Sequence, residues 1–141
     1  REVNFGSLQG TLASANTATK DGVYGAWKKG DFQTPFPGGE CASDVVARGL
    51  ASLRAAAGLG STVVVVAHGG LIKWSAIGMA LGEQPSSAAS MASPAVRELL
   101  AARVQNCCCS TLTFDPASNR FVPDRWFQTW SAEEEALDDT G

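Results

Sequence analysis

Residues 61–73, S-T-V-V-V-V-A-H-G-G-L-I-K, restrict the possible folds more than any other stretch of the chain. The four consecutive valines form a β-branched apolar run, which is typical of a strand buried on both faces of a parallel sheet. The run ends at His68, the only histidine, and two glycines lead into an apolar segment of helical length, Leu71–Leu81. The order of strand, tight turn and helix predicts one unit of an α/β fold.

The turn after the valines is a candidate ligand site. Ligands of open α/β sheets bind beyond the carboxyl ends of the strands, which is where His68 is expected. The N–H groups of Gly69, Gly70 and Leu71 would open the next helix at its positive end, and an anion fits such donors. A histidine that only ends a strand and hydrogen-bonds a backbone carbonyl is the alternative. The Gly-Gly pair favours the functional interpretation, because it allows close approach of a ligand to the backbone.

Other segments carry the start and stop signals of regular elements. Helical spacing of apolar residues predicts one helix, serine followed by proline begins another, and two runs around a turn-rich stretch predict a hairpin. These predictions cover Glu40–Ala57 for the first helix, a start at Ser93-Pro94 for the second, and Cys107–Phe114 with Phe121–Gln128 for the hairpin. A helix that leads into the valine strand is the expected order of a β/α layered fold.

The segment Thr11–Gly39 has no sustained apolar period. A structureless run of that length is uncommon in a compact domain, so the segment is expected to contain a short helix or to serve as a lid. Its aromatic and basic residues either line a substrate pocket or anchor loops, and the sequence leaves both open. They are Tyr24, Trp27, Lys28, Lys29 and Phe32.

Composition excludes several classes of partner. The net charge is −3, so no broad basic surface is expected to attract nucleic acid or a membrane. No apolar stretch reaches the roughly 20 residues needed to span a bilayer. Three of the four cysteines are consecutive, Cys107–Cys109, and neighbours on a strand point to opposite faces. We therefore expect no metal site, and we interpret the cysteines as small core residues of a cytoplasmic protein.

At this point the residues resemble a known family. The stretch V-V-V-V-A-H-G-G-L-I-K resembles the second catalytic-histidine motif of the histidine phosphatase superfamily, the phosphoglycerate mutase-like proteins. R-E-x-x-F-G-x-x-x-G, from Arg1 to Gly10, resembles the acid-bearing motif of that family. W-x-x-G-D from Trp27, followed by P-G-G-E ending at Glu40, resembles the segment before a helix, and Asn106–Leu112 resembles the last core strand.

The resemblance implies a fold and a domain organisation. The fold is a three-layer α/β/α sandwich with a mostly parallel central sheet, formed by residues 1–130 as the C-terminal part of one domain. Residues 131–141 are expected to be a solvated acidic tail. The segment that begins at Ser93 is longer than is usual in the family, so we expect an insertion there and a candidate homodimer surface.

The resemblance also implies roles for particular residues. Glu2 is the general acid, which gives a proton to the departing oxygen and later takes one from the attacking water. His68 contacts the phosphoryl oxygens as a cation, and the N–H of Gly69 adds a donor. Arg1 and Gly70 complete the substrate-binding set. No cofactor or metal is implied.

One element of the family pattern is absent. The nucleophilic histidine of the family lies in an N-terminal L-x-R-H-G motif, which does not occur here. The chain begins at Arg1 within a recognisable motif and without a methionine. We therefore expect the nucleophile and the first strand, which would lie beside the valine strand, to belong to a segment outside residues 1–141.

Three functions follow from these expectations. The first is a phosphatase that hydrolyses small phosphomonoesters through a phosphohistidine. The second is a phosphoglycerate mutase, which is favoured less because the gap between Glu2 and Gly39-Glu40 is short and Gly-Gly-Glu resembles the phosphatase branch of the family. The third is an inactive module that binds phosphorylated ligands or proteins. A serine hydrolase is excluded because its oxyanion loop would use the only histidine, and no dinucleotide-binding or P-loop motif occurs.

Overall fold

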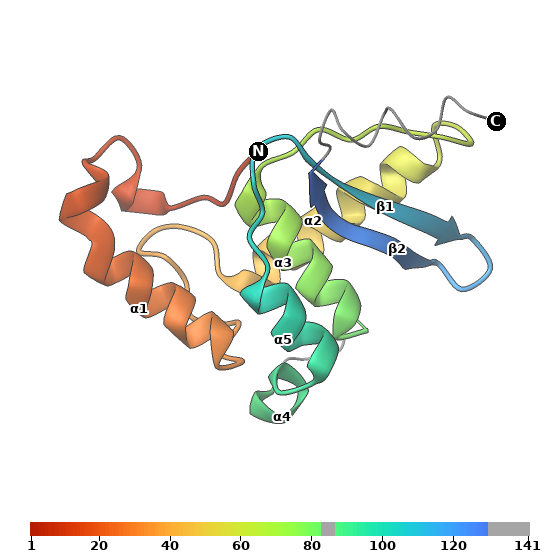
Figure 1. Ribbon diagram of the computed structural model, residues 1–141. Coiled ribbons are helices and arrows are strands. Elements are labelled where there is room, and N and C mark those ends of the chain that lie inside the picture. The colour runs from red at the N-terminus through yellow and green to blue at the C-terminus, as the bar shows by residue number, and fades with distance from the viewer. Residues whose placement is uncertain (83–86, 130–141) are drawn as a thin grey trace. The chain divides into compact units, whose positions relative to one another are not determined.

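The computed structural model describes residues 1–82 and 87–129, which form two compact units. The N-terminal unit is Arg1–Ala101, and the C-terminal unit begins at Ala102. The N-terminal unit contains the short 3-10 helices η1 (Gly6–Leu8) and η2 (Ala13–Asn16) and the helices α1 (Thr17–Lys28), α2 (Ala42–Ala57), α3 (Gly69–Ala80), α4 (Ala88–Met91) and α5 (Pro94–Ala101) (Figure 1). The C-terminal unit contains strands β1 (Cys108–Asp115) and β2 (Arg120–Thr129). The predicted acidic tail lies outside the described residues.

The helices predicted around residues 40–57, 71–81 and 94 onward are confirmed as α2, α3 and α5. Helix α2 begins after Cys41, whose N–H donates to the Asp44 carboxylate at 3.0 Å and whose thiol donates to the same oxygen at 3.1 Å. Helix α5 begins at a proline, as expected from its fixed φ and missing N–H. One further helical turn, α4, precedes α5.

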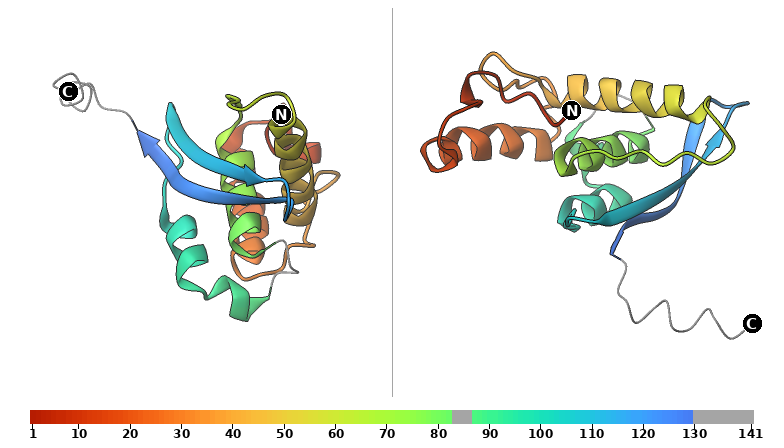
Figure 2. Two further views of the ribbon diagram at one scale, coloured as in Figure 1. Left: turned by 90° about the vertical axis from the view of Figure 1, so that its right-hand side faces the viewer. Right: turned by 90° about the horizontal axis from the view of Figure 1, so that it is seen from above.

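Helix α3 lies between α2 and α5 (Figures 1 and 2), which explains why apolar residues occupy most of its circumference. Two glycines let α2 and α3 approach closely. A Cβ at Gly49 would collide with the Ser75 hydroxyl, and one at Gly78 would collide with Val46. The side chains of Ile77 and Val96 are fully buried in the resulting core.

The Ser75 hydroxyl destabilises the contact between α2 and α3. It is buried and has no hydrogen-bond partner among the described residues. Because an unpaired buried hydroxyl carries its full desolvation penalty, we expect Ser75→Ala to raise the free energy of unfolding by about 1 kcal/mol. Urea denaturation of both proteins measures this change. A loss of stability in the variant would mean that the hydroxyl has a partner in solution.

Residues 11–39 contain a helix, α1, as one of the two expectations had it. The aromatic side chains of this segment form a cluster with Trp74 of α3; its members are Tyr24, Trp27, Phe32, Phe36 and Trp74. Trp27 and Phe36 are fully buried, and the Trp27 indole N–H donates to the Thr34 carbonyl at 2.7 Å. Trp27 and Phe32 therefore anchor the loop and the core. Trp74, which α3 contributes to the cluster, is also buried.

The valine run differs from its prediction. Residues 63–66 form neither a helix nor a strand, and Val64 and Val66 are 87% and 92% exposed. The only sheet in the described part of the chain is the two-stranded antiparallel one, so the predicted parallel central sheet is not formed there. The physical reason is that a β-strand exists only through its neighbours, and no described segment pairs with these valines.

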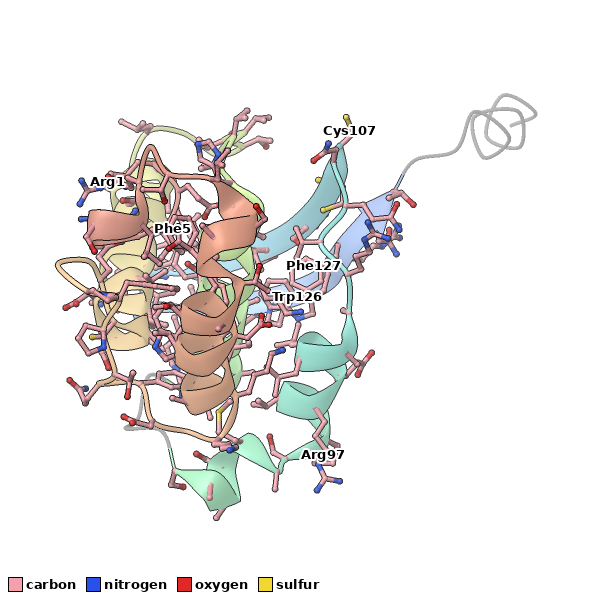
Figure 3. All side chains as sticks on the ribbon, turned by 90° about the vertical axis from the view of Figure 1, so that its left-hand side faces the viewer. Arg1, Phe5, Arg97, Cys107, Trp126 and Phe127 are labelled. Carbon is pink, nitrogen blue, oxygen red and sulfur yellow. The ribbon has the colours of Figure 1, made fainter. Side chains whose placement is uncertain are left out.

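The predicted hairpin is confirmed in the C-terminal unit. Strands β1 and β2 are antiparallel with Asp115 opposite Arg120, and the Asp115 carboxylate accepts the Ala117 N–H at 3.0 Å to close the turn. The register shifts around Ser110, whose hydroxyl accepts the N–H of Phe127 at 3.0 Å. Trp126 and Phe127 are neighbours on β2 (Figure 3).

The interpretation of all four cysteines as core residues was only partly correct. Cys41 is buried, but Cys107, in the turn before β1, and Cys109, on β1, are exposed. All four thiols are free, and no group of three or more candidate ligands could hold a metal ion in the part of the chain that the structure describes. Within the same residues no helix is long and apolar enough to cross a membrane.

Candidate functional site

The carboxylate of Glu2 sits on the first turn of α3. Its Oε1 accepts the N–H of Leu71 at 3.1 Å and that of Val3 at 2.9 Å, and its Oε2 accepts the N–H of Gly70 at 3.3 Å. The sequence predicted an anion at these helix donors, and the described structure places the chain's own carboxylate there. A negative charge is favourable at this position because the first N–H groups of a helix lack partners and its dipole is positive there.

His68 stands next to this carboxylate as the N-cap residue of α3, with extended φ and ψ. Its carbonyl accepts the N–H of Ile72 at 2.9 Å, which begins the helix. The imidazole is exposed and hydrogen-bonds to none of the described residues. The N–H of Gly69 likewise donates to no described atom. An imidazole and one backbone donor therefore stay open beside the docked Glu2.

Glu40 and Arg48 hold the N-terminal segment in this position. The Arg48 guanidinium binds the Glu40 carboxylate through Nε at 2.8 Å and Nη2 at 2.9 Å, a bidentate arrangement. The same guanidinium donates to the carbonyls of Arg1 at 3.2 Å and Glu2 at 3.4 Å. Glu40 in turn accepts the N–H of Asn4 at 2.8 Å. One ion pair at the start of α2 thus fixes the backbone on both sides of the Glu2 side chain.

We call the Glu40–Arg48 ion pair, with its contacts to residues 1–4, the tether. The motif that begins at Arg1 and the one that ends at Glu40 meet there. The segment from Asn4 to Ser7 lies against the loop before α2, with the Ser7 N–H donating to the Pro37 carbonyl and the Glu40 N–H donating to the Asn4 carbonyl, each at 2.9 Å. Gly6 has φ +57°, and a Cβ there would collide with the Pro37 carbonyl. A side chain at Gly6 is therefore excluded by both conformation and space.

Arg1 was expected to bind substrate, and its observed contact is structural. Its guanidinium lies 3.7 Å from Oε1 of Glu40, and its side chain is 69% exposed at the edge of the unit (Figure 3). The structure thus brings Glu2, His68, Gly69 and Gly70 together. Arg1 is connected to them through Glu40. The sequence gave no signal for the contacts of Glu40 and Arg48 with residues 1–4, because the paired residues are about 40 positions apart.

The tether leads to a prediction about how the stability of the fold depends on pH. The Arg48 guanidinium, hydrogen-bonded to Glu40, holds the pKa of that carboxyl below its ordinary value of 4.5. A lowered folded-state pKa means that the carboxylate stabilises the fold above pH 4.5 and that this contribution disappears as the pH falls through the folded-state pKa. We expect the stability difference between the wild type and Glu40→Gln to shrink with decreasing pH. Urea denaturation across a pH series tests this, and a difference that does not vary with pH would contradict it.

The close contact between Gly70 and the Glu2 carboxylate leads to a second prediction, about the variant Gly70→Ala. A Cβ at this position would stand 2.7 Å from Oε1 of Glu2, so Gly70→Ala should displace the carboxylate. Because the flexible side chain can move away and alanine favours a helix, we expect little loss of stability. Misplacing a catalytic group by about 1 Å can cost about 10²-fold in rate, so if Glu2 has the proton-transferring role that the family resemblance implies, steady-state kinetics should show kcat of the natural gene product falling by that order.

A matched control exists on α1. Gly22 is also helical, and a Cβ there would meet nothing within 4 Å. Gly22→Ala should therefore gain helix propensity and leave the site undisturbed. Equal rates for Gly70→Ala and Gly22→Ala would show that the position of the Glu2 carboxylate does not affect turnover.

Comparison with known proteins places this geometry in a family. A family model described as histidine phosphatase superfamily (branch 1) matches residues 1–127, a range that contains Glu2, His68 and both glycines after it. Searches of curated proteins and of solved structures found no match. The family is of the α/β class and includes both phosphatases and mutases. The chain therefore belongs to the histidine phosphatase superfamily, as its motifs implied.

Proposed function

We propose that this chain forms part of a phosphatase that hydrolyses small phosphomonoesters through a phosphohistidine intermediate. The observation that carries the proposal is the docking of the Glu2 carboxylate onto the N–H groups directly after His68, across a sequence separation of 68 positions from Gly70. A proton-transferring carboxylate and an open imidazole thus share one helix end. The superfamily match supports phosphoryl chemistry as the use of this arrangement.

In the proposed reaction the residues have separate tasks. The imidazole of His68 and the N–H of Gly69 bind the phosphoryl oxygens, which carry most of the charge. A nucleophilic histidine attacks phosphorus, the ester P–O bond breaks, and the Glu2 carboxyl gives its proton to the departing alcohol oxygen. Water then attacks the phosphohistidine, Glu2 takes the proton of that water, and inorganic phosphate leaves. Glu2 ends in its starting state.

The nucleophile is proposed to lie outside residues 1–141, because His68 is the only histidine and already has the second role. General acid catalysis contributes about 10² to 10⁴ in rate, whereas phosphomonoester hydrolysis requires an acceleration of up to about 10²¹. We therefore expect the 141-residue chain alone to show no turnover. In the whole domain, residues 63–66 are proposed to pair as a strand of a parallel sheet in a three-layer sandwich. The free thiols agree with the proposed cytoplasmic location.

The test uses the natural gene product that contains this chain. Turnover of p-nitrophenyl phosphate is measured, and the enzyme is quenched in the steady state for intact-mass analysis under neutral denaturing conditions. We expect hydrolysis together with a covalent adduct of one phosphoryl group, stable in alkali and labile in acid. Hydrolysis without such an adduct would exclude the phosphohistidine route.

The same preparation discriminates between the two alternatives. Transfer of the phosphoryl group to a second phosphoglycerate faster than to water would identify a mutase. Binding of inorganic phosphate without any turnover would identify an inactive binding module. The expected result for the phosphatase is release of inorganic phosphate as the main product.

A further inference from the structure

Tyr24 is held rigidly in the aromatic cluster. Its ring is parallel to that of Trp74, with an interplanar angle of 3° and a centroid distance of 6.4 Å. It also meets the ring of Trp27 edge-on at 5.2 Å and that of Phe36 at 5.4 Å. Contacts with three rings at different angles fix the orientation of the phenol, and they therefore fix the direction of its hydroxyl.

This position is next to Glu2. Trp74 follows Gly70 by four residues in α3, so both lie on one face of that helix. The Glu2 carboxylate lies over this face at Gly70, and Tyr24 lies over it one turn further along at Trp74. Two 3-10 turns and the first part of α1 separate the two residues in the sequence, and α3 brings their side chains together.

The electrostatics agree with this placement. Burial, together with the negative charge of Glu2, raises the pKa of Tyr24 to about 12. The phenol therefore stays protonated at neutral pH and remains a hydrogen-bond donor.

The donor is available to a ligand. The Tyr24 hydroxyl hydrogen-bonds to none of the described residues, and Tyr24 is half-buried. Its O–H is therefore not used as a donor within the described part of the chain. Tyr24 thus presents a fixed donor beside the carboxylate that would protonate the leaving group.

We propose that the Tyr24 hydroxyl binds an oxygen of the alcohol portion of the substrate, so that the site selects phosphomonoesters of polyols. The order along α3 is His68 and Gly69, then Glu2 over Gly70, then Tyr24 over Trp74. A phosphoryl group at His68 would therefore direct its ester oxygen to Glu2 and the rest of the alcohol to Tyr24. Tyr24 keeps its proton throughout and determines specificity. This inference depends on the proposed phosphatase function.

The test compares two substrates with the natural enzyme and its Tyr24→Phe variant. Glycerol 3-phosphate and propyl phosphate share a three-carbon ester, and only the former carries hydroxyls on the alcohol. Loss of one neutral hydrogen bond corresponds to about tenfold in kcat/KM. We expect Tyr24→Phe to lose about tenfold on glycerol 3-phosphate and to be nearly unchanged on propyl phosphate, because phenylalanine keeps the ring contacts.

The outcomes separate this inference from the proposed function. Turnover of both substrates with equal kcat/KM in the wild type, or an equal loss on both in the variant, would overturn the role of Tyr24 and leave the phosphatase function intact. Absence of all phosphomonoester turnover would overturn both.

A second measurement needs no activity. Tyrosines of the natural gene product are labelled with carbon-13, and the Tyr24 signal is assigned by its loss in Tyr24→Phe, so that its ionisation can be followed by NMR. Glu2→Gln should move its midpoint down from about 12, whereas Glu98→Gln, an exposed change on α5, should not. A midpoint that does not respond to Glu2→Gln would show that the two side chains are not neighbours, and the inference would fall.

Discussion

Glu2→Gln is expected to lower kcat of the natural enzyme by about 10² to 10⁴, the range that one positioned general acid contributes. Glutamine cannot give up or take a proton, yet its amide oxygen can still accept an N–H from the first turn of α3, as the carboxylate does from Leu71. The loss should therefore fall on kcat, with KM and folding changed little, because proton transfer occurs in the transition state. The measurement is steady-state kinetics on an alkyl phosphate, whose alcohol is a poor leaving group and therefore needs the proton from the general acid.

The control for this change is Glu98→Gln, which removes the same charge from an exposed position on α5. Its kcat should equal that of the wild type. If Glu2→Gln retained wild-type kcat, Glu2 would be only a helix-capping residue, and the proposed proton transfer would have to be assigned to another group.

Glu40→Ala is expected to lower the free energy of unfolding by about 3 kcal/mol, at the low end of the cost of removing one partner from a buried ion pair. Glu40 is only 9% exposed, and its removal leaves the Arg48 guanidinium and the Asn4 N–H without their acceptor. The cost stays at the low end because Arg48 still reaches two backbone carbonyls. Urea denaturation measures the loss, and hydrogen exchange should show faster opening of residues 1–7.

An exposed ion pair on the C-terminal hairpin provides the matched control. Arg125 and Asp124 are 3.5 Å apart with side chains 59% and 63% exposed. Breaking this pair with Asp124→Asn should change stability by less than about 1 kcal/mol, because water screens both charges. If Glu40→Ala cost no more than this control, the tether would be unimportant for the fold.

The sequence predicted the local elements well. Helix α3, the start of α5 and the β1–β2 hairpin follow from signals contained within a few residues, such as apolar spacing, Ser-Pro and a turn-rich stretch. Signals of this kind determine an element where neighbouring residues supply its hydrogen bonds, as in a helix or a two-stranded hairpin.

The valine run is the element that the local signals predicted wrongly for the described structure. Four valines predict a strand, but residues 63–66 are exposed and unpaired in the described structure. The β-branched residues of the run favour an extended backbone. Pairing depends on distant segments, and nothing within the run specifies them.

The site divides in the same way. By itself the sequence determined the family, because the residue types and spacing of its motifs, including Glu2 and His68 with its two glycines, are sufficient for such a match. Only the tertiary structure decided that Glu2 docks on α3, that Glu40 and Arg48 hold it there, and that Tyr24 lies beside it. These contacts join residues tens of positions apart, and their energies depend on burial and orientation, which only the packed chain supplies.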